Sequence, residues 1–506
     1  MSADRRDARA GGRGGRPRGG QQRSGQQRGS APHRTPGRDG APTRRRLPDT
    51  ARGVALGVIM AVREDDAYAN LLLPTRIRRA GLRSDDAALA TELTYGTLRG
   101  WGLYEQILAR AAGRGLNEID RVSADVLRLG AHQLLSTRIP AHAAVHETVE
   151  VARAVVPERA LGFINAVMRR ISERSHEEWV ALLLAEGVER GADARLALET
   201  AHPTWIVAAL RESLAADPSV VEADADLREL LHADNQAPTV SLASLVGERG
   251  AEAPEGVTDL PYSPRGLRWP GGDPGQWSAI ADGSVRVQDE GSQLAALALS
   301  RAHAIASNEI WLDMCAGPGG KSALLAAELL GTGGNLIANE SVPARADLVR
   351  DSVRAVQEVV TVLEGDARRF VEQPGHYDRI LLDAPCTGLG ALRRRPEARW
   401  RKDPDDVAAL VRLQSQLLDA AAVALKPGGV LAYVTCSPHL AETREQVDAL
   451  LARRSGLRSL DTGAVLQSFA RTPLPGVQAG MPVVQLWPHR HGTDAMFITL
   501  LEKVPR

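Results

Sequence analysis

Two of the three cysteines in this chain of 506 residues occupy equivalent positions, each in a turn that directly follows a short apolar run. Cys386 lies in residues 383–388, Asp-Ala-Pro-Cys-Thr-Gly, and Cys436 lies in residues 435–437, Thr-Cys-Ser. Because ligands bind where the carboxyl ends of parallel strands meet, we expect both thiols and Asp383 to share one site. Buried cysteines often serve only as small apolar residues, but the flanking turn residues favour a chemical role. No Cys/His cluster accompanies the pair, so we expect no metal site.

A glycine-rich loop offers a second candidate site. Residues 313–322 read Asp-Met-Cys-Ala-Gly-Pro-Gly-Gly-Lys-Ser between an apolar run and a helical pattern. Glycines let the backbone approach a ligand closely, and a helix N-terminus offers free N–H groups. A phosphate-binding P-loop would need glycine in place of Cys315, and a dinucleotide fingerprint would need it in place of Ser322; a plain tight turn is the other alternative. The expected ligand contacts are Cys315, Ala316, Gly317, Pro318, Gly319, Gly320 and Lys321.

Acidic residues follow the next two apolar runs. Glu340 ends residues 335–340, where an acid can accept hydrogen bonds from both hydroxyls of a ribose. Asp366, in Gly-Asp-Ala-Arg at residues 365–368, is placed to receive an adenine amino group. Together with the glycine-rich loop, these acids describe an adenosine pocket with no phosphate to hold. This combination predicts S-adenosylmethionine as the cofactor.

A thiol beside a methyl donor has a clear chemical use. Carbon 5 of cytosine is a poor nucleophile, but thiolate addition at carbon 6 turns the ring into an enamine whose carbon 5 attacks a methylsulfonium group. The thiolate is the reactive form, so a thiol with a pKa of about 8.5 needs local activation. Asp383 near ring N3 would stabilise the adduct by hydrogen bonding or proton transfer. This chemistry does not decide which of the two cysteines attacks.

Positioning these residues requires a parallel sheet. From about residue 281, short apolar runs alternate with helical patterns, which indicates a doubly wound α/β fold. Two later runs, 483–486 and 496–501, predict an antiparallel hairpin. The predicted strands are 310–314, 335–339, 360–363, 379–383 and 430–435, and the predicted helices are 321–330, 343–357, 405–425 and 441–453.

The chain before this domain divides into three parts. Residues 1–48 are Gly, Arg, Gln and Pro with almost no large apolar side chains, so we expect a disordered tail that serves RNA binding or solubility. Residues 49–190 show apolar spacing of three and four and predict an all-α domain. Asp85 and Asp86 are expected to begin one of its helices as cap and first-turn acids, and Pro140 to start another. Residues 191–280 mix both signals and predict a small α+β connecting module.

Composition limits the class of protein. The sequence has no apolar run of the roughly 18 to 20 residues that a membrane span needs. Three cysteines cannot form a disulfide framework in so long a chain, which indicates a reducing compartment. The formal net charge of +0 conceals thirteen arginines against four aspartates in residues 1–50, attached to a mildly acidic remainder. We therefore expect a cytoplasmic protein without a membrane partner.

The motifs together resemble the Sun/Fmu-type (NOL/NOP/Sun) family of RNA 5-methylcytosine methyltransferases. Residues 313–321 are similar to its cofactor loop, and 383–400 to its longest signature. The helical part resembles the NusB-like RNA-binding domain at 95–99, 126–130, 138–140 and 165–167. The remaining matches are 435–437 and 487–494. The resemblance covers residues 50–506 and implies an all-α NusB-like domain, the connecting module and a Rossmann-like class I methyltransferase domain at 281–506.

The resemblance also assigns roles. It implies that Cys436 is the nucleophile and that Cys386 helps to release the product. It places cofactor contacts at Lys321, Glu340, Arg345, Asp366 and Asp383, and it implies a cytosine of small-subunit (16S) ribosomal RNA as substrate. The sequence departs from the family at three places: Ala243 and Leu245 replace an Arg-x-Asn pair, Thr443 replaces the Asn after Glu442, and Glu340 replaces an Asp.

Alternatives remain open at this stage. The substrate could instead be transfer RNA or DNA, or the chain could be an RNA-binding factor with an inactive methyltransferase fold; intact Asp383, Cys386 and Cys436 argue against inactivity. No protein partner is indicated. A basic stretch after the Cys386 loop predicts contacts with RNA phosphates beside the site. Its members are Arg393, Arg394, Arg395, Arg399, Arg401 and Lys402.

Overall fold

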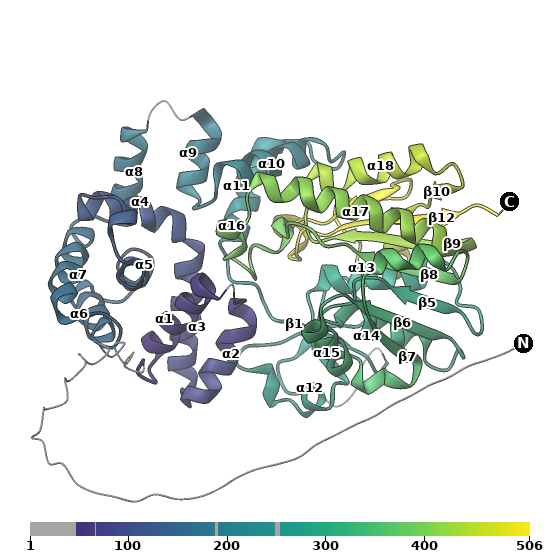
Figure 1. Cartoon of the computed structure of the whole chain (residues 1–506), viewed down its shortest axis with the longest axis horizontal. Helices are drawn as coiled ribbons and strands as arrows, with labels where there is room; N and C mark the ends of the chain where they lie inside the picture. The colour runs from purple at the N-terminus through teal and green to yellow at the C-terminus, as the bar shows by residue number, and fades with distance from the viewer. Residues whose placement is uncertain (1–46, 66, 188–190, 248–252, 506) are drawn as a thin grey trace, which may run out of the picture. The chain divides into compact units, whose positions relative to one another are not determined.

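The computed structural model describes residues 47–65, 67–187, 191–247 and 253–505 (Figure 1). The tail predicted for residues 1–48 lies, except for its last two residues, outside the described part of the chain.

The described residues of the first domain form helices only, as the apolar spacing predicts. The helices start at polar N-caps in several cases: Thr50 accepts from Gly53 N, and Asp120 accepts from Ser123 N. Asp85 and Asp86 lie inside the first turn of their helix rather than at its cap, which is Arg83, and Pro140 is an N-cap residue. The elements are α1 (Ala51–Glu64), α2 (Ala69–Ala80), α3 (Ser84–Arg99), α4 (Trp101–Ala112), η1 (Leu116–Glu118), α5 (Arg121–Ser136), α6 (Ala141–Ala152), α7 (Glu158–Ile171) and α8 (His176–Glu186).

Three more helices and a small sheet connect this domain to the rest. The helices are α9 (Gly191–Glu199), α10 (Thr204–Ala215) and α11 (Ala223–Asp234). The sheet is antiparallel, in the order β2-β3-β1-β4. Its fourth strand lies beyond residue 280, so the sheet extends past the predicted end of the module. The strands are β1 (Ser241–Ser244), β2 (Thr258–Asp259), β3 (Gly266–Arg268) and β4 (Val285–Val287). Two short helices, η2 (Pro274–Gln276) and α12 (Ser278–Asp282), lie between β3 and β4.

The C-terminal domain is built on a sheet in the order β10-β12-β9-β8-β5-β6-β7, with β11 pairing with β12. Strands β7, β6, β5, β8 and β9 are parallel, whereas β10, β11 and β12 pair antiparallel. Each predicted strand is present, with small changes at its ends. The strands are β5 (Ile310–Asp313), β6 (Asn335–Glu340), β7 (Val360–Glu364), β8 (Tyr377–Asp383), β9 (Leu425–Thr435), β10 (Leu457–Ser459), β11 (Val483–Gln485) and β12 (Phe497–Lys503).

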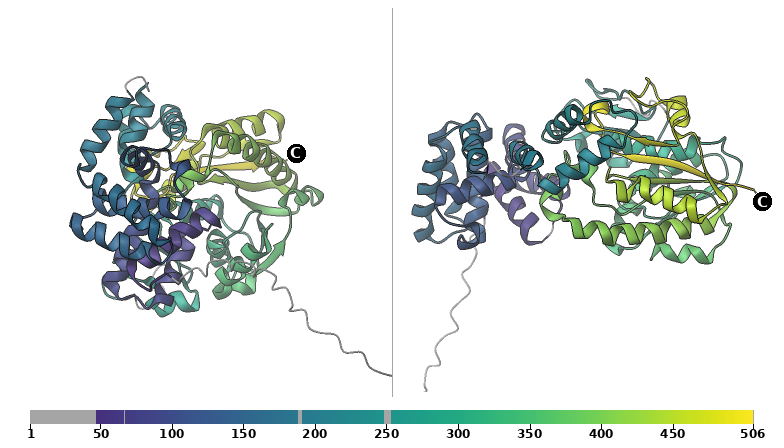
Figure 2. Two further views of the ribbon diagram at one scale, coloured as in Figure 1. Left: turned by 60° about the vertical axis from the view of Figure 1, so that its left-hand side comes forward. Right: turned by 90° about the horizontal axis from the view of Figure 1, so that it is seen from above.

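Helices cover both faces of this sheet (Figure 2). Alternate strand residues face opposite layers: Trp311 and Leu381 pack with α13 and α14, whereas Leu312 and Leu382 pack with α17 and α18. The helix predicted over 343–357 ends at Ser352, and a 3-10 segment continues it. The elements are α13 (Glu290–Arg301), α14 (Gly320–Leu329), α15 (Pro343–Ser352), η3 (Arg354–Val359), η4 (Ala367–Glu372), η5 (Leu389–Ala391), α16 (Ala398–Arg401), α17 (Pro404–Ala424), η6 (Leu440–Glu442), α18 (Arg444–Arg453), α19 (Thr462–Phe469) and α20 (Pro488–His491).

Helix α17 passes a length and hydropathy test for a membrane span, and it is the one described helix that does. A core helix of a water-soluble domain passes the same test, and α17 buries Leu417, Leu418 and Ala421 against the sheet. It is therefore weak evidence for a membrane span.

The short helix α16 joins the methyltransferase-like domain to the helices before it (Figure 1). Trp400 Nε1 donates to Leu98 O at 2.7 Å, and Arg401 Nη2 donates to Val62 O at 2.6 Å. Arg399 is fully buried and donates to Asp234 O and to Asn235 Oδ1, both at 2.7 Å. The loop that follows Cys386 is thus also the joint between domains.

Candidate active site

The two cysteine turns meet as the parallel sheet requires. Cys386 follows β8 and Cys436 follows β9, and these strands are hydrogen-bonded neighbours. The two Sγ atoms lie 3.5 Å apart, which is a hydrogen-bond distance for sulfur and not a disulfide. Gly390 N donates to Cys436 O at 2.8 Å and fixes the second turn against the first.

The two thiols differ in acidity. The hydrogen bond from Cys386 lowers the pKa of Cys436, against the opposing effects of burial and of the charge on Asp383. The positive charges of Arg395 and Lys321 lower the pKa of Cys436 further. The same hydrogen bond and burial raise the pKa of Cys386 well above its usual range. These directions favour the thiolate at Cys436, and in that state Cys386 is the thiol that donates to it.

Lys321 and Asp383 form an ion pair where β8 ends and the Cys386 turn begins. Lys321 Nζ lies 2.8 Å from Asp383 Oδ2, bringing the first turn of α14 to the end of β8. Burial lowers the pKa of Lys321, but Asp383 and the Cys436 thiolate outweigh it and the net direction is upward. Lys321 thus remains a cation that can balance the charge of Asp383 and Cys436 together.

Glu442 fixes the two cysteine turns relative to each other. In the sequence it stands out only as the residue before Thr443, where this chain differs from the family. Its carboxylate is fully buried and accepts from Thr387 N at 2.8 Å, from Thr387 Oγ1 and from Ser437 Oγ at 2.6 Å. Gln414 Nε2 of α17 donates to it at 3.2 Å. Thr387 follows Cys386 and Ser437 follows Cys436, so one side chain fixes the residue after each thiol. A buried acid six residues after a candidate nucleophile is the signal that could have found it.

The glycine-rich loop is packed so closely that side chains could not replace Gly317 or Gly319. A Cβ on Gly317 would meet Glu340 Oε2 at 2.3 Å. Gly319 has φ +105°, and a Cβ there would meet Ser352 Cβ at 2.4 Å. Glu340 is buried and accepts from Gly317 N at 3.1 Å, while Arg345 Nη2 donates to Gly317 O at 2.7 Å. Loop, acid and arginine therefore form one assembly at the carboxyl ends of β5 and β6.

The other predicted contacts of this loop lie around that assembly. Ala316 N donates to Asn339 O at 2.9 Å, and Gly319 N donates to Ala316 O at 2.7 Å. Ser352 Oγ donates to Pro318 O at 2.6 Å. Gly320 is the first residue of α14, and Cys315 packs against the core, where burial raises its thiol pKa.

Asp366 lies at the end of the next parallel strand. It caps η4 by accepting from Arg368 N at 2.9 Å, and the Arg368 guanidinium donates to both of its oxygens. This contact lowers the pKa of Asp366. The carboxylate is half exposed, so it can still accept from a ligand.

These groups suit S-adenosylmethionine. Glu340 and Asp366 are hydrogen-bond acceptors at successive strand ends, as a ribose and an adenine amino group require, and the tight glycine loop brings backbone close to both. The one lysine of the loop is committed to Asp383, which leaves no cation in the loop for a phosphate. Among the described residues, no cluster of His, Cys, Asp and Glu suits a metal ion.

Most of the basic stretch has partners within the protein, and Arg399 is buried, so the structure removes that residue from the predicted RNA contacts. Arg394 pairs with buried Asp494, and Arg393 Nη2 donates to Gly492 O at 2.6 Å. Arg399 and Arg401 donate to backbone carbonyls at the joint between domains. Lys402 lies 4.0 Å from Asp406. Arg393, Arg399 and Arg401 thus bind backbone carbonyl groups, and Arg394 is neutralised by a carboxylate.

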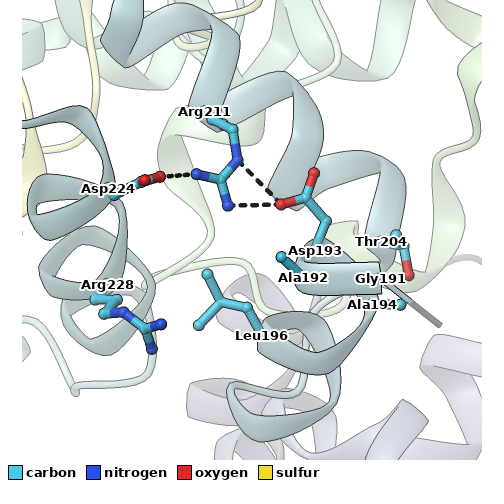
Figure 3. A pocket seen from close by; sticks show the side chains of 9 residues that line it. All are labelled: Gly191, Ala192, Asp193, Ala194, Leu196, Thr204, Arg211, Asp224 and Arg228. Carbon is cyan, nitrogen blue, oxygen red and sulfur yellow. Dashed lines mark hydrogen bonds and ion pairs between the residues drawn. The ribbon is translucent and has the colours of Figure 1, made fainter. Parts of the chain in front are cut away.

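The clearest cavities lie away from the cysteines. One of about 470 Å³ is lined by α9, α10 and α11, where Arg211 is bonded to both Asp193 and Asp224 (Figure 3). Another of about 360 Å³ is lined by α4, α9 and Trp400. Since Arg211 is neutralised by two carboxylates, the first cavity offers no reactive group, and the convergence of residues at the strand ends defines the site instead.

Comparison with known proteins gives a consistent result. A family model described as 16S rRNA methyltransferase RsmB/F matches residues 301–502, and a NusB family model matches residues 49–173. A Vibrio cholerae protein named ribosomal RNA small subunit methyltransferase B is 33% identical over 430 residues, covering 83% of this chain and 91% of that protein. A Mycobacterium tuberculosis protein named as a methyltransferase is 46% identical over 466 residues, covering 91% and 98%. The crystal structure of PH0851 has the same fold, with a TM-score of 0.73 and 21% identity over 90% of this chain and 99% of that one.

Proposed function

Because this chain belongs to the RsmB/F family of small-subunit ribosomal RNA methyltransferases, we propose that it methylates carbon 5 of a cytosine in 16S ribosomal RNA through a covalent adduct with Cys436. The family uses S-adenosylmethionine, which supplies an electrophilic methyl group. The observation that carries the proposal is the pair of thiols 3.5 Å apart, of which Cys436 is the more acidic.

The residues divide the work as follows. The Cys436 thiolate adds to carbon 6 of the cytosine and forms a carbon–sulfur bond, which makes carbon 5 nucleophilic. The Asp383 carboxyl, held in place by Lys321, carries a proton and donates it to ring N3, which neutralises the negative charge that develops there as the carbon–sulfur bond forms. After carbon 5 accepts the methyl group from the sulfonium, a base takes the proton of carbon 5. The electrons of that carbon–hydrogen bond re-form the double bond between carbons 5 and 6, the carbon–sulfur bond breaks, and the Cys436 thiolate leaves. Cys386, which donates to Cys436, stabilises that leaving thiolate.

The cofactor contacts follow from the loop assembly. We assign the ribose hydroxyls to Glu340 and the adenine amino group to Asp366, with the backbone of residues 315–320 against the rest of the cofactor. Arg345 holds Gly317 O and the Glu340 carboxylate in place. Lys321 and Asp383 stand between this pocket and the thiols, so they contact the reacting end.

We also propose a cytoplasmic location. Two thiols at 3.5 Å are readily oxidised to a disulfide, and a reducing compartment keeps them reduced. Ribosomal RNA is made and assembled in that compartment in bacteria, so enzyme and substrate meet there.

Bisulfite sequencing tests the reaction. Ribosomal and transfer RNA from cells with and without the gene are compared, and one cytosine of 16S ribosomal RNA is expected to resist conversion only when the gene is present. A protected cytosine in transfer RNA would move the activity to the alternative substrate. Purified protein that methylates a 16S transcript at another base or atom would disprove the cytosine assignment and leave the methyltransferase intact.

A further inference from the structure

Tyr68 is an exposed aromatic residue of the helical domain beside the catalytic loop. It immediately precedes α2, and 52% of its surface is open to solvent. The guanidinium of Arg395 lies 5.5 Å from the centre of its ring, and that of Arg401 lies 5.7 Å away. An exposed aromatic ring beside two guanidinium groups offers an apolar face and nearby positive charge at the same place.

Backbone contacts fix this ring near Cys436. Ala69 N, next to Tyr68, donates to Glu397 Oε1 at 3.3 Å, so the start of α2 is tied to the catalytic loop. In that loop, Arg395 N donates to Ala391 O at 2.9 Å, and Gly390 N, one residue earlier, donates to Cys436 O at 2.8 Å. Arg395 is therefore connected to Cys436 through residues 390 and 391 and two backbone hydrogen bonds.

Arg395 differs from its basic neighbours. Arg401 serves the joint between domains by donating to Val62 O and Ala67 O. Arg393 and Arg399 donate to carbonyl oxygens, whereas the Arg395 guanidinium has neither a carbonyl nor a carboxylate as a hydrogen-bond partner in the described parts of the chain, and its Nε is buried without one. Such a guanidinium beside a half-exposed ring is the pair of groups that binds a nucleotide: the ring stacks on a base, and the cation holds a phosphate or stacks in turn.

We propose that Tyr68 and Arg395 bind a nucleotide of the ribosomal RNA that neighbours the target cytosine, with its base stacked on Tyr68 and its phosphate on Arg395. This inference rests on the proposed function, because it takes the target base to enter at Cys436. A base flipped out of its stack leaves its neighbours without a stacking partner, and Tyr68 supplies one. The helical domain thereby contributes a specific residue to the site.

The first test measures binding of a 16S ribosomal RNA transcript to three variants of the full-length protein. Tyr68→Ala is expected to weaken binding by roughly 5- to 100-fold, the range for loss of one aromatic stacking contact. Tyr68→Phe should bind within about twofold of the unchanged protein, because it keeps the ring. Leu71→Ala is the matched control: Leu71 is 57% exposed in the same helix but has no ring to stack. Affinity for S-adenosylmethionine and melting temperature should be the same in all three.

The second test compares the unchanged protein with the Tyr68→Ala and Leu71→Ala variants. Each protein binds a synthetic RNA hairpin that carries the target cytosine. Abasic sites are placed one at a time on either side of that cytosine. At one position the abasic site should weaken binding, and Tyr68→Ala should add no further loss there. A Tyr68→Ala loss that persists beside every abasic site, or that Leu71→Ala equals, would overturn the proposal. Transcript binding does not depend on which base is methylated, so failure of the cytosine assignment would be seen separately.

Discussion

At the scale of single residues, the two thiols have different tasks because each perturbs the other. A hydrogen bond from Cys386 favours the thiolate of Cys436, and the reverse arrangement is disfavoured by the raised pKa of Cys386. The chemistry of cytosine methylation left the choice of nucleophile open. The electrostatics of this site favour Cys436, in agreement with the role that family resemblance implies.

Replacing each cysteine should therefore give opposite results. Cys436→Ala is expected to lose turnover by roughly 1000-fold or more, since no adduct forms. Cys386→Ala should still attack and methylate but release slowly, so it should accumulate a protein–RNA complex that survives a denaturing gel. Because Cys386 also lowers the pKa of Cys436, complex formation in this variant should shift to higher pH.

The double variant serves as the control for this assignment. It should resemble Cys436→Ala, because release has no effect when no bond forms. A trapped complex in Cys436→Ala, with none in Cys386→Ala, would reverse the roles of the cysteines. Full activity in both single variants would rule out covalent catalysis.

Glu442 offers a test of how the thiols are positioned. Glu442→Gln places an amide NH2 where the carboxylate accepts from Thr387, Ser437 and Gln414. Donors then face donors in a buried place, at a cost of about 1–3 kcal/mol. The variant is expected to melt at a lower temperature and to form the covalent complex more slowly. Glu445→Gln, at an exposed position three residues on, is the control and should change neither the melting temperature nor the rate of complex formation. If its effects equal those of Glu442→Gln, the hydrogen bonds of Glu442 are not the cause.

At the scale of helices and strands, the sequence predicted the large sheet well and the small sheet poorly. Strands such as 310–314 are continuous apolar runs between helical patterns, and their order is constrained by right-handed parallel crossovers. The small sheet instead uses strands of two to four residues, and Val285–Val287 pairs with 242–244 far earlier in the chain. Such short strands carry too little periodicity to be recognised before their partners are known. The predicted fold class is nevertheless confirmed.

The end of α11 holds a buried carboxyl whose ionisation affects stability. Burial raises the pKa of Asp234 to about 7, although the charge of Arg399 opposes the rise. Neither carboxyl oxygen has a hydrogen-bond partner among the described residues. Between pH 4 and 7, roughly, the folded state keeps this proton and the unfolded state releases it, so the Asp234 contribution to stability falls as pH rises, by at most about 1.4 kcal/mol per pH unit.

Asp234→Asn should remove that trend. The melting temperature of the variant relative to the unchanged protein is expected to rise with pH across this window. His202, 3.9 Å away, contributes the opposite slope because burial lowers its pKa, and it is present in both proteins, so the difference isolates Asp234. Asp224→Asn, at an exposed position, should show a flat difference. An equally flat difference for Asp234→Asn would mean that Asp234 is ionised throughout.

At the scale of the whole molecule, the joint between domains was the feature least open to prediction. A run of arginines looks the same in sequence whether it faces RNA or interior carbonyl groups. Here the partners of Arg399 and Trp400 are backbone oxygens 165 and 302 residues away in the chain. Only the folded arrangement brings those oxygens to α16, so the sequence could not show that Arg399 is buried at the joint, where it cannot reach RNA.

Gly102 tests whether this joint sets the geometry of the catalytic loop. A Cβ on Gly102 would lie 2.4 Å from Trp400 Cζ3, so Gly102→Ala must move the indole. The adjacent cavity of about 360 Å³ gives it room, at a cost of about 1–3 kcal/mol for the displaced packing. We expect roughly tenfold slower methylation of the 16S transcript with unchanged binding of S-adenosylmethionine. Gly162→Ala, in α7 with nothing near its Cβ, is the control and should keep full activity. Unchanged methylation in both variants would show that the joint between domains does not affect catalysis.

The hydrogen bond between Trp400 and Leu98 also limits how early the domains can dock while the chain is being synthesised. Its two ends are 302 residues apart, and a ribosome adds about 5–20 residues per second. For roughly 15 to 60 s after Leu98 is made, the nascent helical domain must therefore persist with its docking face uncovered. The catalytic loop reaches its final position only after nearly the entire polypeptide has emerged. A translation product truncated before residue 400 would carry the helical domain and no working chemistry.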